Sequence, residues 1–323
     1  MKILVIEMSN LGDAILTYPA LSALWEKYPG AEMQVLASPR NRALFEGDPR
    51  VRRVWLLDRH SSVWGQAALV FRLFRQRFNL VVDFRNSLIP LFLFARGRTP
   101  LFRRTADPEH RATRHLSLVT GLGIPPPSRV QPLSYGPEDE QEVRRWLNPA
   151  HPVVLIAPGS RSHLKRWSAE GFAEVADRLA TEREAQILLV GDAEERPITK
   201  HVRGIMRSQA ADYAGHTTLR QLAALLSKAS LVITNDSAML HAAGVMGVPT
   251  VAIFGPTDER KYGPRGPRTA VVRRSLVCSP CEKALCPYQH ECMTLVSPNE
   301  VYSAAVRVLI HRDGSVVTPG SYM

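Results

Sequence analysis

The chain has 323 residues, and 45% of them are hydrophobic, which is enough for two domains with cores of their own. The sequence contains no run of 18 or more apolar residues, so no membrane-spanning helix is expected. The start, MKILVIEMSNLGD, is typical of a buried strand and not of a signal peptide. The expected location is therefore the cytoplasm. The net charge of +11 lies in residues 34–136, which hold 17 arginines, no lysine and 6 acids. Such a charge favours an anionic partner, which could be nucleic acid, anionic lipid or a phosphorylated substrate. The alternative is a solvated basic face that only keeps the protein soluble.

The first half of the chain alternates between predicted strands and helices. Apolar strands are expected at residues 2–6, 33–37, 53–57 and 80–84, and helices at 14–28 and 63–78. This order predicts a parallel sheet with crossover helices. The first strand runs into Ser9, Asn10, Gly12 and Asp13, where a dinucleotide-binding protein would place several glycines. A carboxylate such as Asp13 in a first helical turn is stabilised by the helix dipole whatever its task.

An apolar run, Leu88–Ala95, lies inside the arginine-rich region. It is flanked by Arg85, Arg96, Arg98, Arg103 and Arg104. The run is too short to span a bilayer. It is either a segment that rests on a membrane surface, with arginines at the phosphate headgroups, or a buried core helix with a basic rim.

A proline-rich stretch, residues 123–139, predicts a linker between two domains, 1–135 and 136–323. After it the alternation restarts. Strands are expected within residues 152–160, 185–192, 231–236 and 249–258, and helices at 168–182, 194–206, 218–229 and 237–246. The sequence thus predicts two doubly wound α/β domains that face each other across a hinge, with the C-terminal tail as a candidate to pack back on the first domain.

Three strand-to-helix turns of the second half carry polar residues. They contain Ser160 and Lys165, then Asn235, Asp236 and Ser237, then Gly255, Thr257 and Asp258. Each turn alone is explained by an N-cap or an ordinary turn. Because the carboxyl ends of parallel strands meet at one edge of a sheet, the three turns should converge, and they predict a pocket for a nucleotide diphosphate.

All four cysteines of the chain lie within 15 residues, as Cys278, Cys281, Cys286 and Cys292. In a reducing cytoplasm a structural zinc is favoured over disulfides, and His290 could replace one ligand. Free or disulfide-bonded thiols are the alternative.

Several stretches resemble the family 9 glycosyltransferases, the heptosyltransferases of the lipopolysaccharide inner core. They are SNLGDAILTYPALSAL, PGS followed by LKRWSAEGFAEVADRL, AGHTTLRQLAALLSKASLVITNDSAMLHAAGVMGVPTVAIFGPTD, and the cysteine-rich segment. The resemblance implies a GT-B fold, in which two Rossmann-like domains bind substrates in the cleft between them. The N-terminal domain would bind an anionic acceptor, Kdo- or heptose-bearing lipid A, and the C-terminal domain ADP-heptose. It further implies inverting, metal-independent transfer at the cytoplasmic face of the inner membrane, with no nucleic acid and no required cofactor.

The resemblance also implies roles for single residues. Asp13 would be the general base that takes the proton of the acceptor hydroxyl. Lys165, with the backbone N–H groups near Ser237, would stabilise the charge on the leaving ADP. Asp236 would bind sugar hydroxyls. The complete set of expected donor-binding residues is Ser160, Asp236, Ser237, Gly255 and Thr257.

Other functions compete with this interpretation. They are a GT-B glycosyltransferase with another nucleotide sugar, a sugar-nucleotide epimerase of the same fold, an inactive binding module, and a basic nucleic-acid-binding protein with a zinc knuckle. An epimerase needs no acceptor, and a nucleic-acid-binding protein would show salt-sensitive binding to oligonucleotides.

Overall fold

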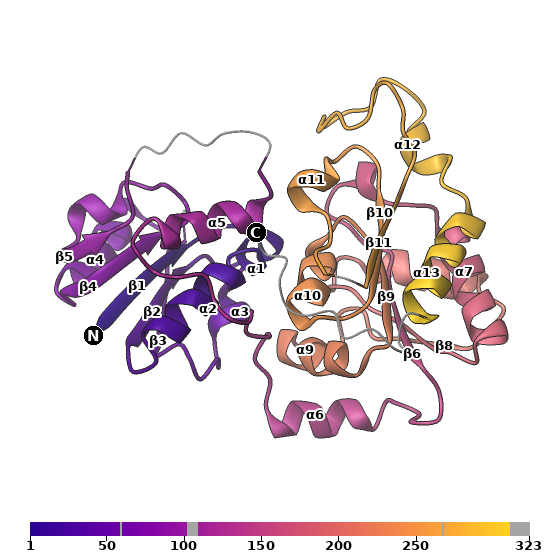
Figure 1. Ribbon diagram of the computed structural model, residues 1–323, viewed down its shortest axis with the longest axis horizontal. Helices are drawn as coiled ribbons and strands as arrows, with labels where there is room; N and C mark the ends of the chain where they lie inside the picture. Colours follow the sequence, from indigo (N-terminus) through magenta and orange to yellow (C-terminus); the bar gives the residue numbers. More distant parts are fainter. Residues whose placement is uncertain (59, 102–108, 267, 311–323) are drawn as a thin grey trace. The chain divides into compact units, whose positions relative to one another are not determined.

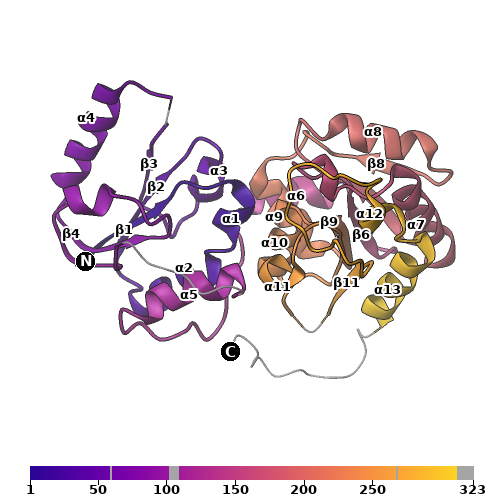
Figure 2. The same cartoon turned by 90° about the horizontal axis from the view of Figure 1, so that it is seen from above.

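The computed structural model describes residues 1–58, 60–101, 109–266 and 268–310. Arg103, Arg104 and the C-terminal tail lie outside these ranges. The chain divides into two compact units, Met1–Ser134 and Tyr135–Met323. Figures 1 and 2 show the elements of each unit.

The first unit is built on a parallel sheet with the strand order β3-β2-β1-β4-β5. The strands are β1 (Lys2–Glu7), β2 (Glu32–Ala37), β3 (Arg53–Leu56), β4 (Phe78–Asp83) and β5 (Ala95–Arg98). The helices are α1 (Leu11–Ile15), α2 (Tyr18–Lys27), α3 (Arg42–Phe45), α4 (Val63–Phe74), the 3-10 helix η1 (Ile89–Phe92) and α5 (Arg111–Thr120). Helix α4 covers one face of the sheet, and α2 with α5 covers the other (Figure 2).

Two predictions for this part of the chain are wrong in detail. The helix expected at 14–28 is broken into α1 and α2, because Pro19 in the first turn of α2 has no N–H for the preceding turn. The expected linker 123–139 includes the start of a helix, α6, at Pro137, because proline is well tolerated in the first turn of a helix.

The second unit is built on a parallel sheet with the order β11-β10-β9-β6-β7-β8. The strands are β6 (Val153–Ala157), β7 (Gln186–Leu189), β8 (Ala210–Asp212), β9 (Leu231–Asn235), β10 (Thr250–Phe254) and β11 (Thr269–Arg273). The helices are α6 (Pro137–Arg144), the 3-10 helix η2 (His163–Lys165), α7 (Ala169–Glu182), α8 (Arg196–Ile205), α9 (Leu219–Lys228), α10 (Ala238–Met246), α11 (Glu259–Tyr262), α12 (Glu291–Thr294) and α13 (Pro298–Ile310). The two predicted doubly wound parallel α/β domains are thereby confirmed.

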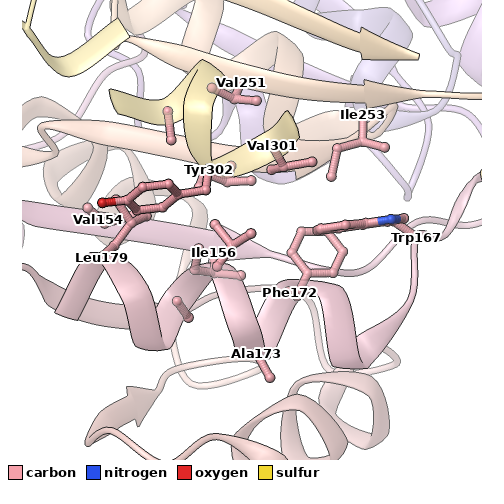
Figure 3. Packing of buried hydrophobic residues seen from close by; sticks show 14 of the residues in the cluster. Val154, Ile156, Trp167, Phe172, Ala173, Leu179, Val251, Ile253, Val301 and Tyr302 are labelled. Carbon is pink, nitrogen blue, oxygen red and sulfur yellow. The ribbon is translucent and has the colours of Figure 1, made fainter. Parts of the chain in front are cut away.

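The core of the second unit holds α7 and α13 against one face of its sheet (Figure 3). The alternate residues of β6 and β10 point into this core, because successive side chains of a strand face opposite sides. The Trp167 ring packs edge-on against Phe172, with ring centroids 5.0 Å apart, and its Nε1 donates to the Val296 carbonyl at 3.0 Å. Trp167 thus anchors the loop between η2 and α7 in the core.

No helix in the described ranges combines the length and the apolar character that crossing a bilayer requires.

Candidate active site

Each sheet has one point where the chain reverses its direction of travel. In the second unit the chain leaves β6 toward β7 and β8, then returns to the other side of β6 as β9. In the first unit the same change lies between β1 and β4. The loops on either side of such a point diverge and leave a crevice at the carboxyl ends of the strands, which is where α/β sheets bind ligands. Most of the predicted site residues lie in these loops.

The loops after β6 and β9 are joined by an ion pair between two of the predicted residues. Lys165 Nζ lies 2.6 Å from Asp236 Oδ2, with the Lys165 side chain 33% exposed and the Asp236 side chain 6% exposed. The Ser160 hydroxyl donates to the Asp236 carbonyl oxygen at 3.1 Å. The prediction that these turns converge is therefore confirmed for Ser160, Lys165 and Asp236, although no sequence pattern indicates that the lysine and the aspartate pair.

A buried amide fixes the position of the Lys165 loop. Asn235, the last residue of β9, accepts a hydrogen bond from the Trp167 N–H at 3.1 Å and donates one from Nδ2 to the Pro158 carbonyl at 2.8 Å. Arg166 Nε donates to the Ser160 carbonyl at 2.8 Å. The loop from Pro158 to Trp167 is thus fastened at both ends, so the ammonium group of Lys165 is held on a rigid support.

Ser237 is the N-cap residue of α10. Its hydroxyl lies 3.1 Å from the hydroxyl of Thr234, and this contact turns it toward β9. The first N–H groups of α10 and the helix dipole provide positive potential beside the Lys165–Asp236 pair. An anion is the ligand that such a helix start favours.

The loop after β10 contains Gly255, Thr257 and Asp258. The two polar residues are both buried. Asp258 is the N-cap residue of α11 and accepts hydrogen bonds from the guanidinium and the backbone N–H of Arg260, which lower the pKa of its carboxyl. A Cβ atom on Gly255 would lie 2.4 Å from Met293 Sδ. The close approach that this glycine allows is therefore to α12, which explains the glycine by packing.

In the first unit, Asp13 lies in the first turn of α1, just after β1, and is partly buried. The neighbouring Glu7 ends β1 and is buried, with its Oε1 accepting hydrogen bonds from the N–H (2.8 Å) and the hydroxyl of Ser9. Burial raises the pKa of Glu7, while the Ser9 hydrogen bonds and the charge of Arg85 oppose the rise and Asp13 adds to it. This switch point thus gathers two carboxyl groups and one arginine around the turn that carries Asp13.

Two carboxyl groups near the switch points were missed in the sequence. Glu7 could have been noticed as a charged residue that ends an otherwise apolar strand. Glu195 precedes α8, and its Oε1 lies 2.2 Å from where a Cβ of Gly159 would be, so it faces the loop after β6. Burial raises the pKa of Glu195. Its chain position, a few residues after β7, was the available signal.

The four cysteines line one cavity of about 630 Å³, together with His290. Burial raises the pKa of Cys292 to about 11, and the other three thiols add to the rise, which reflects their proximity. Among the described residues, however, no three His, Cys, Asp or Glu side chains are arranged to hold a metal ion. The structural zinc remains a prediction that the side-chain positions do not themselves support.

The cysteine-rich segment does have a place beside the predicted donor loops. The N–H groups of Cys281 and Glu282 donate to the Pro256 carbonyl at 2.9 and 2.8 Å. The His290 ring contacts the carbonyl of Leu164, next to Lys165. The segment therefore supports the loops after β6 and β10 from one side, a role that the sequence did not reveal.

Comparison with known proteins identifies a family. A family model described as glycosyltransferase family 9 (heptosyltransferase) matches residues 67–291. A curated relative, lipooligosaccharide heptosyltransferase 2 of Campylobacter jejuni subsp. jejuni serotype O:2, is 27% identical over 320 residues, which cover 96% of this chain and 98% of the relative.

Solved structures show the same fold. The Escherichia coli ADP-heptose lps heptosyltransferase II superposes with a TM-score of 0.79 at 23% identity, covering 97% of this chain and 100% of that one. A family 9 glycosyl transferase from Veillonella parvula superposes with a TM-score of 0.84 at 22% identity, covering 96% and 97%.

Proposed function

The chain belongs to glycosyltransferase family 9 and is a glycosyltransferase, and from this premise we propose that it transfers a heptose from ADP-heptose to the inner core of lipopolysaccharide. The acceptor in this proposal is Kdo- or heptose-bearing lipid A, and the enzyme works at the cytoplasmic face of the inner membrane. The reaction inverts the anomeric carbon and needs no divalent metal or other cofactor. The names of the curated relatives support the sugar and the acceptor class.

The observation that carries the proposal is the Lys165–Asp236 pair at the switch point of the second unit. The diphosphate of ADP-heptose competes with Asp236 for the lysine ammonium, and the first N–H groups of α10 supply further positive potential. Once its partner turns toward the diphosphate, the Asp236 carboxylate accepts hydrogen bonds from sugar hydroxyls. Ser160, Ser237 and Thr257 provide hydroxyl groups around the same loops.

Transfer is a single displacement in this scheme. The acceptor oxygen forms a bond to the anomeric carbon as the bond from that carbon to the phosphate oxygen breaks, with its electron pair going to ADP. Asp13, in the first turn of α1, takes the proton of the acceptor hydroxyl. Lys165 stabilises the charge that develops on ADP, and it does so most strongly in the transition state.

The first test is acceptor-dependent release of ADP from ADP-heptose, with a panel of heptose-poor core acceptors. Replacing a general base typically costs about 10²- to 10⁴-fold in rate, so Asp13→Asn should lower the turnover by that much while the variant stays folded. Glu170→Gln is the matched control, since Glu170 is a carboxylate in the first turn of a different helix, α7.

Each outcome decides between interpretations. Release that survives Asp13→Asn at the wild-type rate would reduce Asp13 to a carboxylate that stabilises a helix start. Acceptor-dependent release from another nucleotide sugar, with none from ADP-heptose, would keep the glycosyltransferase and reject the heptose. Conversion of a nucleotide sugar without any acceptor would indicate an epimerase.

A further inference from the structure

An apolar surface on the first unit is left open by the fold. Its members come from two segments, α4 and the stretch around η1, and all are exposed. They are Val63, Trp64, Phe71, Phe74, Leu88, Leu91, Phe92 and Phe94, called here the α4–η1 surface. Trp64 is 85% exposed and Phe92 63% exposed. Large side chains of this kind are usually buried, and when several gather on one surface they mark a place where another molecule binds.

The exposure follows from how α4 sits on its sheet. Leu69, Val70 and Leu73 face inward and pack against the cluster that contains Leu4 and Ile6 of β1. Because a helix has 3.6 residues per turn, Phe71 then lies on the side of α4 opposite the sheet, and Phe74 lies on its flank; both side chains are exposed. Helix α4 thus has apolar side chains on more than one side, and its own domain buries only the side that faces the sheet.

The two segments lie next to each other in the fold and pack on the same buried cluster. Helix α4 contacts η1 directly. Just beyond the end of α4, the Arg77 guanidinium lies over the Phe94 ring, 5.7 Å from its centroid. The sequence had left open a buried core helix for Leu88–Ala95; that alternative is wrong, because the structure has the short η1 there with exposed Leu88, Leu91 and Phe92.

The charge around this surface has one sign. Residues 61–101 contain six arginines and a single acid, Asp83. Asp83 is buried and its carboxylate accepts hydrogen bonds from the N–H groups of Arg85 and Ser87, each at 2.7 Å. The exposed arginines are Arg72, Arg75, Arg77, Arg85 and Arg96. The outward potential is therefore basic, and a second copy of this surface would bring like charges together.

We propose that the α4–η1 surface docks the enzyme on an anionic phospholipid bilayer. Tryptophan and phenylalanine side chains enter the interfacial layer of a membrane, and arginines beside them bind the lipid phosphates. The inference deepens the proposed function, which places the acceptor in a bilayer, and its choice of occupant follows from the combination of exposed aromatic rings with an arginine rim.

The test uses the full chain and cosedimentation with vesicles. One set contains phosphatidylcholine alone, and the other contains phosphatidylcholine and phosphatidylglycerol in equal parts. Wild type should bind the anionic set and be released by salt. Trp64→Ala with Phe92→Ala should weaken this binding by about tenfold or more, because two large interfacial anchors are lost. Arg72→Gln with Arg75→Gln should weaken it by at least about fivefold.

Matched controls carry the same chemistry elsewhere. Ile205→Ala with Ile310→Ala removes exposed apolar side chains from the second unit, and Arg144→Gln with Arg145→Gln removes exposed charges from α6. Both controls should bind vesicles as wild type does. Trp64→Phe should keep binding but lose the quenching of tryptophan fluorescence by brominated lipids, which reports on the depth of that ring.

The same variants separate this inference from the proposed function. With a lipid-free core oligosaccharide as acceptor, the Trp64/Phe92 variant should transfer heptose at the wild-type rate, because neither residue belongs to the candidate active site. Vesicle binding without any heptose transfer would reject the proposed function alone. Wild-type vesicle binding by the Trp64/Phe92 variant would reject the docking surface, as would the absence of vesicle binding by wild type. A dimer of wild type that the substitutions dissociate would assign the surface to a second copy instead.

Discussion

The Lys165–Asp236 pair is asymmetric, and this predicts which of its two members the fold needs more. Substituting Lys165 by methionine keeps much of the apolar stem but leaves the Asp236 carboxylate, 6% exposed, without its cation. Substituting Asp236 by asparagine leaves the Lys165 ammonium group, whose side chain is 33% exposed and which water can reach. The first variant strands a buried charge and the second does not.

The expected energies follow from this difference. A hydrogen bond to a charged group contributes about 1.5–3 kcal/mol, and partial access of water to Lys165 reduces this to about 1–2 kcal/mol for Lys165→Met. Asp236→Asn should cost about 1 kcal/mol or less. In the double variant the stranded charge is gone, so its free energy of unfolding should be higher than that of Lys165→Met alone.

Chemical denaturation of the three variants measures these values, and Lys228→Met provides the control. Lys228 Nζ lies 2.7 Å from Glu140 Oε1, and its side chain is 34% exposed, but the Glu140 side chain is 28% exposed. The two lysines thus differ in the anion that each leaves behind: Asp236 is more buried, and Glu140 keeps a second cation, since its Oε1 also lies 2.9 Å from the Arg144 guanidinium. ADP release in the same preparations gives the catalytic effect, where losing a transition-state donor should cost Lys165→Met about 10²- to 10³-fold.

Two results would refute the reasoning. If Lys165→Met is as stable as Lys228→Met, the Asp236 carboxylate is not penalised by its burial. If the double variant is less stable than Lys165→Met, the substitution at Asp236 removes something other than a stranded charge. A normal rate of ADP release from Lys165→Met would leave the pair a purely structural feature.

Three further substitutions or measurements follow from the structure. Gly255→Ala should lower the free energy of unfolding by about 1–3 kcal/mol, and adding Met293→Ala should restore part of it; no loss in a thermal melt would show that α12 moves aside easily. Burial raises the pKa of Glu7 above 4.5, so the free energy of unfolding of the wild type should fall as the pH rises through that raised pKa. In urea titrations from pH 4.5 upward, the free energy of unfolding of Glu7→Gln relative to the wild type should therefore increase with pH. A difference that shrinks with rising pH would contradict this. Metal analysis of protein purified under reducing conditions tests the four cysteines, and well under one zinc per chain would remove the zinc hypothesis.

Much of the fold could be predicted because it depends on local patterns. The apolar runs at 153–157 and 231–235 are buried strands. Ser168 and Thr218 are the N-cap residues of the predicted helices α7 and α9. Among the elements that were not expected, the strands β5 and β8 are short and lie at sheet edges, whereas the helices α5 and α13 have 10 and 13 residues. Strands of three or four residues bury too few side chains to produce a readable period, and the sheet beside them supplies the hydrogen bonds that define them.

The sequence by itself determined that polar residues follow the strands at Asp13, Ser160 and Asp236, and that the arginines gather in the first domain. It could do so because strand ends and charge are local properties. Only the tertiary structure decided the pairing of Lys165 with Asp236, residues 71 positions apart, and the joining of α4 to η1 in one exposed surface. Both depend on which strands become neighbours and on which side of a helix the sheet covers, and these are fixed by packing across the whole domain.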